Sequence, residues 1–171
     1  AVSLTETTLA FGRVQDPVPH LERVALKTIV EDVLSQEALA LSDADRIQME
    51  TDVGAMTLRV DPEQLSRALQ NLVRNARQAL QTAGQGGAIS IHAGETEEDW
   101  WITVADTGPG LPEKATPVRF QAFSGGTRTH GTGLGLVIAQ ELVAGHGGQL
   151  TLEHSDATGT RFKITLPKSI A

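Results

Sequence analysis

The sequence predicts an α/β protein, a two-layer sandwich in which three helices cover one face of a mixed, mostly antiparallel sheet. A long amphipathic helical pattern covers residues 61–81, and two further helical segments cover residues 27–41 and 134–144. Segments with the apolar and polar alternation of strands lie between these helices. A chain of 171 residues is long enough to build one such domain around a proper hydrophobic core.

Residues 61–81 have a strong helix start. Asp61 can cap the helix, Pro62 suits the first helical position, and Gln64 follows the cap by three residues. Apolar residues then recur at helical steps and define one face to be buried: Leu65, Leu69, Leu72, Ala76 and Ala79. At about 100° per residue, a polar set falls on the opposite side and is expected to face water: Arg67, Gln70, Arg74, Arg77 and Gln81.

Three amide side chains, Asn71, Asn75 and Gln78, fall between these two faces of the helix. An amide at the edge of a buried face must find a partner, because leaving it unpaired costs about 1–3 kcal/mol. Two asparagines one turn apart could therefore face a polar ligand. They could equally satisfy the carbonyl groups of a loop, and the helix alone does not decide between these interpretations.

The other elements follow in order along the chain. Residues 2–14 have helical spacing but are too short to stand alone, and two prolines indicate a linker at residues 15–20. Strands are expected at 23–26, at 47–53 and 56–60 joined by a turn at Gly54, and at 88–93, 100–105, 149–153 and 160–166. The helix at 27–41 should turn five residues inward: Ile29, Val30, Val33, Leu34 and Ala38. Trp100 and Trp101 point to opposite faces, so at most one belongs to the core.

Composition narrows the classes of function. A net charge of −7 argues against a nucleic-acid-binding protein with a global basic surface, so an anionic ligand needs a local basic site. The chain has no cysteine and therefore no disulfide or thiolate chemistry. No apolar run approaches the roughly 20 residues of a membrane span, and no signal peptide is visible. Because the chain begins at Ala1, we expect it to be an excised part of a larger protein.

Between residues 106 and 132 the periodicity is lost. A loop of this length in a compact domain usually forms an active-site lid or a binding loop. It opens with Asp106-Thr107-Gly108-Pro109-Gly110 directly after a strand, where an aspartate could be a buried acceptor, although such sequences are also common in simple turns. The basic side chains of the loop outnumber the acidic Glu113 and supply a local positive charge: Lys114, Arg119 and Arg128.

The loop ends in Gly131-Thr132-Gly133-Leu134-Gly135-Leu136 at the start of a predicted helix. Three glycines at alternate positions expose backbone N–H groups beside the positive helix end, which favours an anion. The segment is neither a Walker loop nor a dinucleotide-binding G-x-G-x-x-G. Other catalytic patterns are weak: the histidines lack metal spacing, nothing sets Ser124, His130 and Asp106 as a triad, and eukaryotic protein-kinase signatures are missing.

Four motifs, in this order, resemble those of the ATP-binding catalytic domain of bacterial sensor histidine kinases, whose wider relatives are gyrase, Hsp90 and the mismatch-repair ATPases. NLVRNA resembles the asparagine box, DTGPG the first glycine box, RFQAF the phenylalanine box and GTGLGL the second glycine box. The closing GTRFKITLP also fits, so the resemblance covers roughly residues 23–166. It implies a Bergerat-type ATP-binding fold.

The resemblance implies roles for the matching residues. Asn75 would bind Mg²⁺, Asn71 would act catalytically on the phosphate side, and Asp106 would accept the adenine amino hydrogen. Gly108 and Gly110 would let the backbone pass the base. The second glycine box would bind the phosphates through backbone N–H groups of five residues: Gly131, Thr132, Gly133, Leu134 and Gly135. Arg128 would reach the γ-phosphate, and Thr160 would help Asp106 to hold adenine through water. Two aromatic residues would anchor the lid: Phe120 and Phe123.

The resemblance also implies cofactors and partners, namely ATP or ADP with Mg²⁺, a phosphoacceptor histidine on a dimerisation domain, and a response regulator. Residues 1–20 would be the tail of the dimerisation helix and a linker, and 21–171 the catalytic domain. His20 lies in a proline-rich linker and is not expected to be the phosphoacceptor. We therefore expect a cytoplasmic fragment that binds ATP without labelling itself, belongs to a homodimeric full-length kinase, binds no nucleic acid and does not insert into a membrane.

Three other functions stay open at this stage. An ATPase switch of the gyrase or Hsp90 type has a glutamate base four residues before the metal asparagine, but Asn71 holds that place, so hydrolysis should be slow. A serine kinase of the anti-sigma type is disfavoured by the dimerisation-helix remnant before Pro17. A domain that binds nucleotide only to regulate a partner is disfavoured by the intact motifs. Gln78 replaces a basic residue of some relatives and receives no role.

Overall fold

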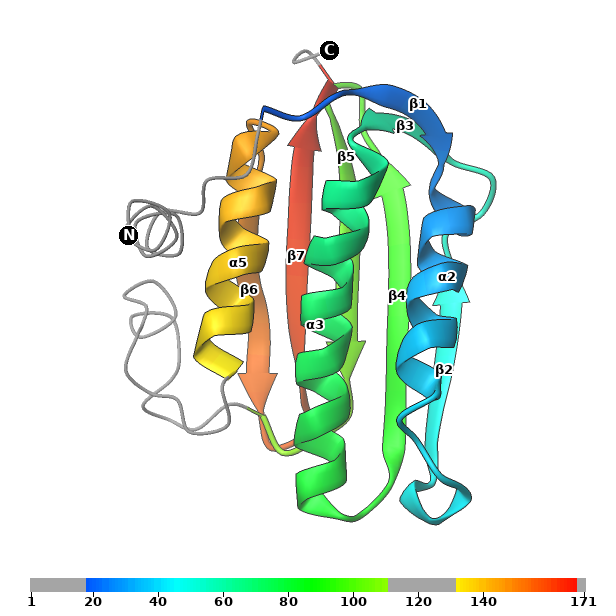
Figure 1. Ribbon diagram of the computed structural model, residues 1–171. Helices are drawn as coiled ribbons and strands as arrows, with labels where there is room; N and C mark the ends of the chain where they lie inside the picture. Colours follow the sequence, from blue (N-terminus) through cyan, green and yellow to red (C-terminus); the bar gives the residue numbers. More distant parts are fainter. Residues whose placement is uncertain (1–17, 111–131, 169–171) are drawn as a thin grey trace, which may run out of the picture.

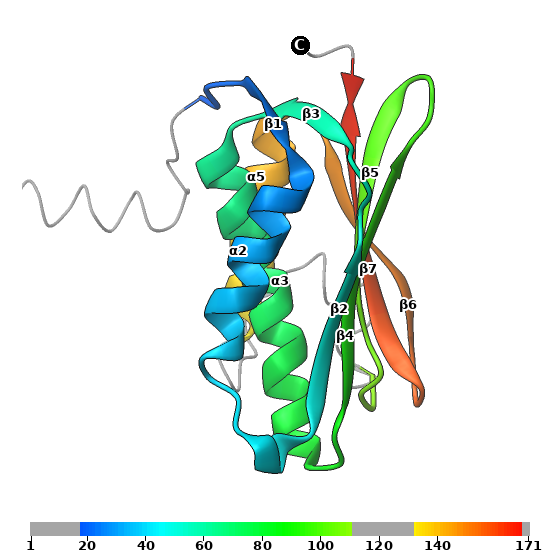
Figure 2. The ribbon, with the colours of Figure 1, turned by 90° about the vertical axis from the view of Figure 1, so that its right-hand side faces the viewer.

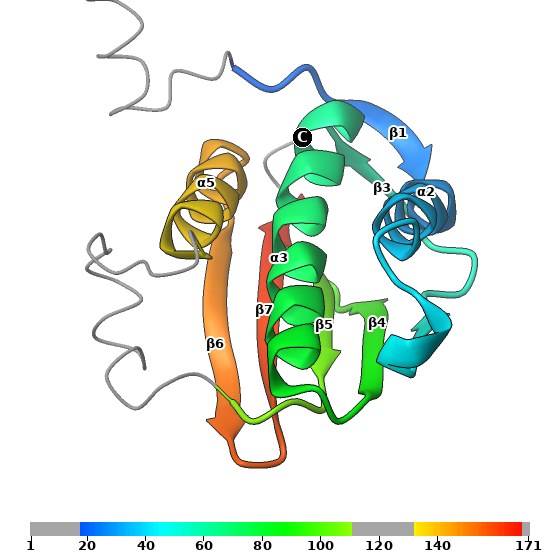
Figure 3. The same cartoon turned by 60° about the horizontal axis from the view of Figure 1, so that its bottom comes forward.

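The computed structural model describes residues 18–110 and 132–168, which form a layer of helices and a layer of strands (Figures 1 and 2). Three helices in these ranges cover the same face of the large sheet: α2 (Leu26–Ala38), α3 (Pro62–Ala83) and α5 (Thr132–Gly145). The middle position belongs to α3 (Figure 3). The predicted two-layer α/β sandwich is confirmed.

The large sheet has five strands in the order β2-β4-β5-β7-β6. Their bounds are β2 (Ile47–Asp52), β4 (Gly87–Glu95), β5 (Asp99–Asp106), β6 (Gln149–Asp156) and β7 (Gly159–Pro167). Only the β2 and β4 pair is parallel, and the other neighbours in this sheet are antiparallel. A small second sheet pairs β1 (Glu22–Ala25) with β3 (Thr57–Val60) antiparallel. The sheet is therefore mixed and mostly antiparallel, as predicted.

The two strands predicted around the turn at Gly54 are both present, but they belong to different sheets. β2 pairs with β4, which follows α3 in the chain, so a crossover containing that helix joins two parallel strands. β3 instead pairs with β1 at the entry to the domain. The turn at Gly54 therefore leads the chain from one sheet to the other.

The start of α3 has the predicted cap. The Asp61 carboxylate accepts hydrogen bonds from the backbone N–H groups of Glu63 and Gln64, both at 3.1 Å, and Pro62 holds the first helical position. The helix runs for 22 residues to Ala83, and Gly84 caps its end. Four residues of the predicted apolar face are buried: Leu65, Leu69, Leu72 and Ala76. The fifth, Ala79, is half-buried.

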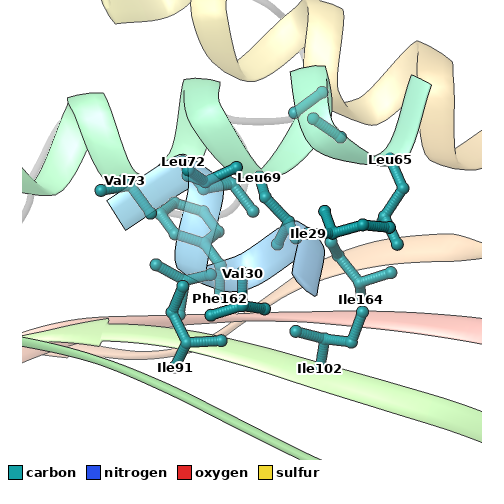
Figure 4. Close-up of a cluster of buried hydrophobic side chains, with 14 of the residues drawn as sticks. Ile29, Val30, Leu65, Leu69, Leu72, Val73, Ile91, Ile102, Phe162 and Ile164 are labelled. Atoms are coloured by element: carbon teal, nitrogen blue, oxygen red, sulfur yellow. The ribbon is translucent and has the colours of Figure 1, made fainter. Parts of the chain in front are cut away.

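The core fills the space between α3 and the inner face of the sheet (Figure 4). Leu69 and Leu72 of α3 meet Ile91, Ile102 and Ile164 of β4, β5 and β7, and each of these side chains is at most 1% exposed. Burying one aliphatic side chain of this size contributes about 1.5–3 kcal/mol. This packing fixes α3, and the amides it carries, against the sheet.

One side of α3 that was predicted to face water is covered by α2. Arg77 Nε and Gln70 Nε2 donate to the Glu37 carboxylate of α2 at 2.9 and 3.1 Å. Gln81 Nε2 donates to the carbonyl of Ala40 at 3.1 Å, just beyond α2. The prediction was wrong for these three polar residues, because the pattern of one helix does not show where a second helix packs.

The inward face of α2 also differs at one point. Ala38 is exposed, and its neighbour Glu37 is buried at 4% exposure. Of the other expected residues, Ile29, Val30 and Val33 are buried and Leu34 is half-buried. The Glu37 carboxylate can take the buried place expected for Ala38 because polar side chains of α3 donate hydrogen bonds to it.

The two adjacent tryptophans of β5 occupy opposite faces of the sheet, as predicted. Trp100 is 7% exposed and belongs to the core. Trp101 lies half-buried on the outer face over Gly94, where a Cβ atom would stand 2.5 Å from the ring, with the Lys163 ammonium 5.7 Å from the ring centre. Within the described ranges no helix is both long and apolar enough to cross a membrane.

Candidate functional site

The asparagine-bearing part of α3 and the glycine-rich start of α5 lie side by side. The two helices are antiparallel neighbours (Figure 1), and the Asn71 side-chain oxygen is 3.5 Å from the position of a Cβ atom on Gly135. Asn71 Nδ2 donates to the carbonyl of Arg67 at 3.1 Å. The amide is thereby oriented, and its oxygen lies towards the positive end of α5.

Asn75 lies one turn further along α3, on the same stripe as Asn71. Its side chain is half-buried, and no residue in 18–110 or 132–168 forms a hydrogen bond with its amide. A half-buried amide without a partner among these described residues is suited to a polar ligand or a hard cation, because the amide oxygen is a ligand that such cations accept. The structure therefore fits the expected Mg²⁺ site at Asn75.

Asp106 ends β5 on the face that the helices cover, as the alternation with the inward Ile102 and Val104 requires. Its Oδ1 accepts the N–H of Gly108 at 2.8 Å. Burial raises the pKa of Asp106 above its usual value, and the N–H groups of Gly108 and Thr160 only partly oppose this effect. A half-buried carboxylate with remaining acceptor capacity is suited to a specific donor, such as an exocyclic amine.

The turn after Asp106 packs against the second half of α3. A Cβ atom on Gly108 would stand 3.2 Å from Leu80 of α3 and 3.1 Å from the Asp106 carboxylate. The absence of a side chain at Gly108 thus lets the backbone of this turn lie close to both groups. Because Asn71, Asn75 and Leu80 follow one another along α3, the amides and the carboxylate border the same helix.

The ends of β6 and β7 support this turn. Thr160 lies opposite Asp106 in the β5 and β7 register and is buried, with its hydroxyl 3.3 Å from that of Ser155. Gly110 has φ 87°, and a Cβ atom there would overlap the carbonyl of Asp156. The structure therefore brings Gly108 and Thr160 to Asp106, whereas Gly110 lies against the end of β6 at Asp156.

Several predicted site residues lie outside the described residues. They comprise the lid and the first glycine of the second glycine box: Glu113, Lys114, Arg119, Phe120, Phe123, Arg128 and Gly131. The backbone of Thr132, Gly133 and Leu134 forms the first turn of α5, which begins two residues before the predicted start. Residues 2–14, predicted as a helical segment, also lie outside.

The motifs did not point to two residues that lie against the elements of the site. His146, directly after α5, is 6% exposed, and its Nε2 accepts the N–H of Asp61 at 3.1 Å. Leu80 forms the apolar wall beside Gly108. The sequence contains one signal for His146, its position between the glycines that end α5. Spacing among the histidines bears only on metal binding, which it does not support, so it did not point to this role.

The comparisons with known proteins decide the family. Residues 60–170 match the family described as "Histidine kinase-, DNA gyrase B-, and HSP90-like ATPase". The chain belongs to this family. The matched range contains both asparagines, Asp106 and the start of α5.

The curated relatives are sensor histidine kinases. ZraS of Escherichia coli (strain K12) is 31% identical over 154 residues, covering 88% of this chain and 32% of ZraS. The sensory histidine kinase/phosphatase NtrB of Salmonella typhimurium is 33% identical over 164 residues, covering 90% of this chain and 45% of NtrB. The chain thus spans less than half the length of either relative.

Solved structures agree with this assignment. The catalytic domain of the histidine kinase ThkA superposes with a TM-score of 0.72 at 27% identity, covering 87% of this chain and 96% of that one. Full-length ShkA in complex with AMPPNP gives a TM-score of 0.74 at 25% identity, covering 96% of this chain and 35% of that one. The chain is therefore the ATP-binding catalytic domain of a histidine kinase. The gyrase-type and anti-sigma-type alternatives are not favoured.

Proposed function

We propose that this domain holds Mg²⁺-ATP between α3 and the start of α5 and presents the γ-phosphoryl group to a histidine of a separate dimerisation domain. A response-regulator aspartate then receives the phosphoryl group. The observation that carries the proposal is the approach of Asn71 to Gly135, which sets the asparagine stripe beside the glycine-rich helix start. Asp106 borders the same helix at the adenine end of the site.

The division of roles follows from the position of each residue. Asp106 accepts the adenine amino hydrogen, with Thr160 beside it. Asn75 is the Mg²⁺ ligand, and the cation neutralises phosphate charge when it is bound. Asn71 orients the phosphate groups of the nucleotide. The phosphates also meet the backbone N–H groups of the helix start and the lid arginine: Gly131, Thr132, Gly133, Leu134, Gly135 and Arg128.

The chemical step is a transfer to nitrogen. An imidazole nitrogen of the acceptor histidine forms a bond to the γ-phosphorus, the bond from that phosphorus to the bridging oxygen breaks, and ADP leaves with the electron pair. The domain contributes position and charge neutralisation rather than a covalent intermediate. Asn71 stands where a water-activating glutamate would be needed, so hydrolysis stays slow.

The proposal extends to the setting of the domain. The full-length kinase is a homodimer that brings the dimerisation helix of one subunit to a catalytic domain, and residues 1–20 are the connecting tail and linker. The domain works in the cytoplasm, where ATP and the response regulator are found.

Calorimetric titration with AMPPNP, with and without Mg²⁺, tests binding. We expect Mg²⁺-dependent binding of the nucleotide to the fragment. In a second assay with radiolabelled ATP, we expect acid-labile label on an added dimerisation domain with its histidine and none on the fragment alone. Label on the isolated fragment, or an absence of nucleotide binding at millimolar Mg²⁺, would contradict the proposal.

A further inference from the structure

A buried polar junction lies at the end of the helix layer opposite the asparagines. It consists of Asp61, His146 and the backbone of His20, and it joins three segments of the chain. Asp61 precedes α3, His146 follows α5, and His20 precedes β1 at the entry to the domain. Asp61 and His146 are 8% and 6% exposed.

Asp61 uses each of its polar groups in this junction. Its Oδ1 accepts the N–H groups that begin α3, while its Oδ2 accepts the N–H of His20 at 2.9 Å. Its own N–H donates to His146 Nε2 at 3.1 Å. Burial alone would raise the pKa of Asp61, but its three backbone N–H donors outweigh burial and lower it. The group is therefore a carboxylate at neutral pH.

The hydrogen bonds of His146 require one protonation state. The Asp61 N–H can only donate, so Nε2 must carry a lone pair. Nδ1 lies 3.0 Å from the carbonyl of Leu142 and must therefore carry the hydrogen. The ring is neutral, with both nitrogens satisfied inside the protein, and it connects the last turn of α5 to the first residue before α3.

The junction and the proposed ATP site lie at two ends of the same helix pair. About 15 Å of α3 separates Asp61 from Asn71, and a similar length of α5 separates Gly135 from His146. The helices thus approach each other at the ligand end, where Asn71 faces Gly135, and are hydrogen-bonded at the far end through Asp61 and His146. A ligand that fixes one end constrains the other, because packed helices move as rigid elements.

We propose that His146 is a positioning residue that couples nucleotide binding between α3 and α5 to the segment entering the domain at His20. The inference rests on the proposed function for the identity of the ligand. In this arrangement the entering segment follows α3 and α5 together, because the Asp61 carboxylate holds the segment and the Asp61 N–H holds α5. Nucleotide binding then changes the stability of the segment without contacting it.

Amide hydrogen exchange measured by NMR on the full chain tests the coupling, with and without Mg²⁺-AMPPNP. In the natural chain we expect the nucleotide to slow exchange at His20 and at residues 22–25. Asp61→Asn keeps an acceptor for the α3 cap but lacks the second carboxylate oxygen. It should speed exchange of the His20 amide about tenfold, the scale of a lost hydrogen bond to a charged group. The Gln64 amide should stay protected.

His146 is tested by a matched pair of variants. His146→Gln can place an oxygen at the position of Nε2, so it should retain the nucleotide response at residues 20–25. His146→Leu has no acceptor and should lose that response while still binding AMPPNP. Glu63→Gln, an exposed change in the first turn of α3, should behave like the natural chain. If His146→Leu does not fold, the comparison of Asp61→Asn with the natural chain decides.

The outcomes separate this inference from the proposed function. A nucleotide that binds but leaves residues 20–25 unchanged, or a response that persists in His146→Leu, would overturn the coupling. Failure of AMPPNP to bind would instead overturn the proposed function. In that case the nucleotide-free comparison of Asp61→Asn with the natural chain still decides, because an unchanged His20 exchange rate would show that the Asp61 carboxylate does not hold the segment.

Discussion

Arg77 Nε donates to Glu37 Oε1 at 2.9 Å, and the two side chains are only 13% and 5% exposed. Glu37 also accepts hydrogen bonds from Gln70 and, at 3.5 Å, from Arg74. This cluster joins α2 to the side of α3 that does not face the sheet. It holds the asparagine helix in place from behind the ligand site.

Glu37→Ala should destabilise the domain strongly, because it leaves the buried Arg77 guanidinium without its partner. Breaking a buried pair in this way costs about 3–5 kcal/mol. Urea unfolding followed by circular dichroism measures the change. Glu31→Ala is the matched control, because Glu31 lies on the same helix in an exposed pair with Lys27 at 4.0 Å. Equal effects of the two substitutions would show that the cluster adds no particular stability to the domain.

Asp106→Asn should weaken binding of adenine nucleotides by about 1–3 kcal/mol, the scale of a hydrogen bond to a charged group. The substitution keeps an acceptor for the Gly108 N–H but lacks the ionised oxygen that the adenine amine needs. Calorimetric titration with AMPPNP and Mg²⁺ measures the loss. Unchanged affinity would exclude Asp106 from the site.

The same substitution should raise thermal stability at pH 7 in the absence of nucleotide. Burial raises the pKa of Asp106, so the ionised carboxylate costs folding free energy above that pKa, and asparagine carries no such cost. As pH falls through the raised pKa, the natural side chain becomes protonated and the difference should disappear. Melting temperatures of both proteins between pH 7 and pH 4 check this. A difference that does not shrink at low pH would show that burial of the charged carboxylate is not its cause.

Asn75→Ala should reduce the gain in nucleotide affinity that Mg²⁺ provides. The lost interaction is one oxygen ligand, for which we expect roughly a tenfold reduction, the equivalent of about 1.4 kcal/mol. Affinities of AMPPNP with Mg²⁺ and with EDTA give the gain for each variant. Gln78→Ala, on the same stripe and also half-buried, is the control and should preserve the gain. Equal Mg²⁺ dependence in all three proteins would show that Asn75 does not bind the cation.

Gly159→Ala should weaken both folding and nucleotide binding. Gly159 has φ 147°, and a Cβ atom there would overlap the backbone oxygen of Asp106. Backbone strain alone costs about 1–3 kcal/mol, and displacement of Asp106 should lower affinity as well. Gly54→Ala is the control, since Gly54 has φ 60° but open space around its Cβ position. It should lose stability but bind AMPPNP normally, and the same behaviour for Gly159→Ala would disprove the link to Asp106.

The features that could be predicted from sequence were mostly local. The Asp61 cap and the apolar face of α3 depend on spacing within one helix, and both agree with the structure. The β5 alternation likewise separated Trp100 from Trp101 correctly. The family motifs selected Asn71, Gly108 and Asp106, which the fold brings to the same helix.

The features that could not be predicted depend on which elements pack together. Nothing in the pattern of α3 shows that α2 covers Gln70 and Arg77, so their burial required the tertiary structure. The parallel pairing of β2 with β4 is likewise a property of the crossover rather than of either strand. His146 is important through a contact with Asp61, 85 positions away in the chain.

The placement of the tryptophans on β5 has a spectroscopic consequence. Trp100 and Trp101, the two tryptophans of the sequence, lie near the start of this strand, and Asp106 ends it, after about 16 Å of extended backbone from Trp101. Adenine held by Asp106 is too far away to stack on either indole. A change in intrinsic fluorescence on adding nucleotide would therefore report an adjustment of the sheet or of the Lys163 ammonium over Trp101, and not direct quenching by the base.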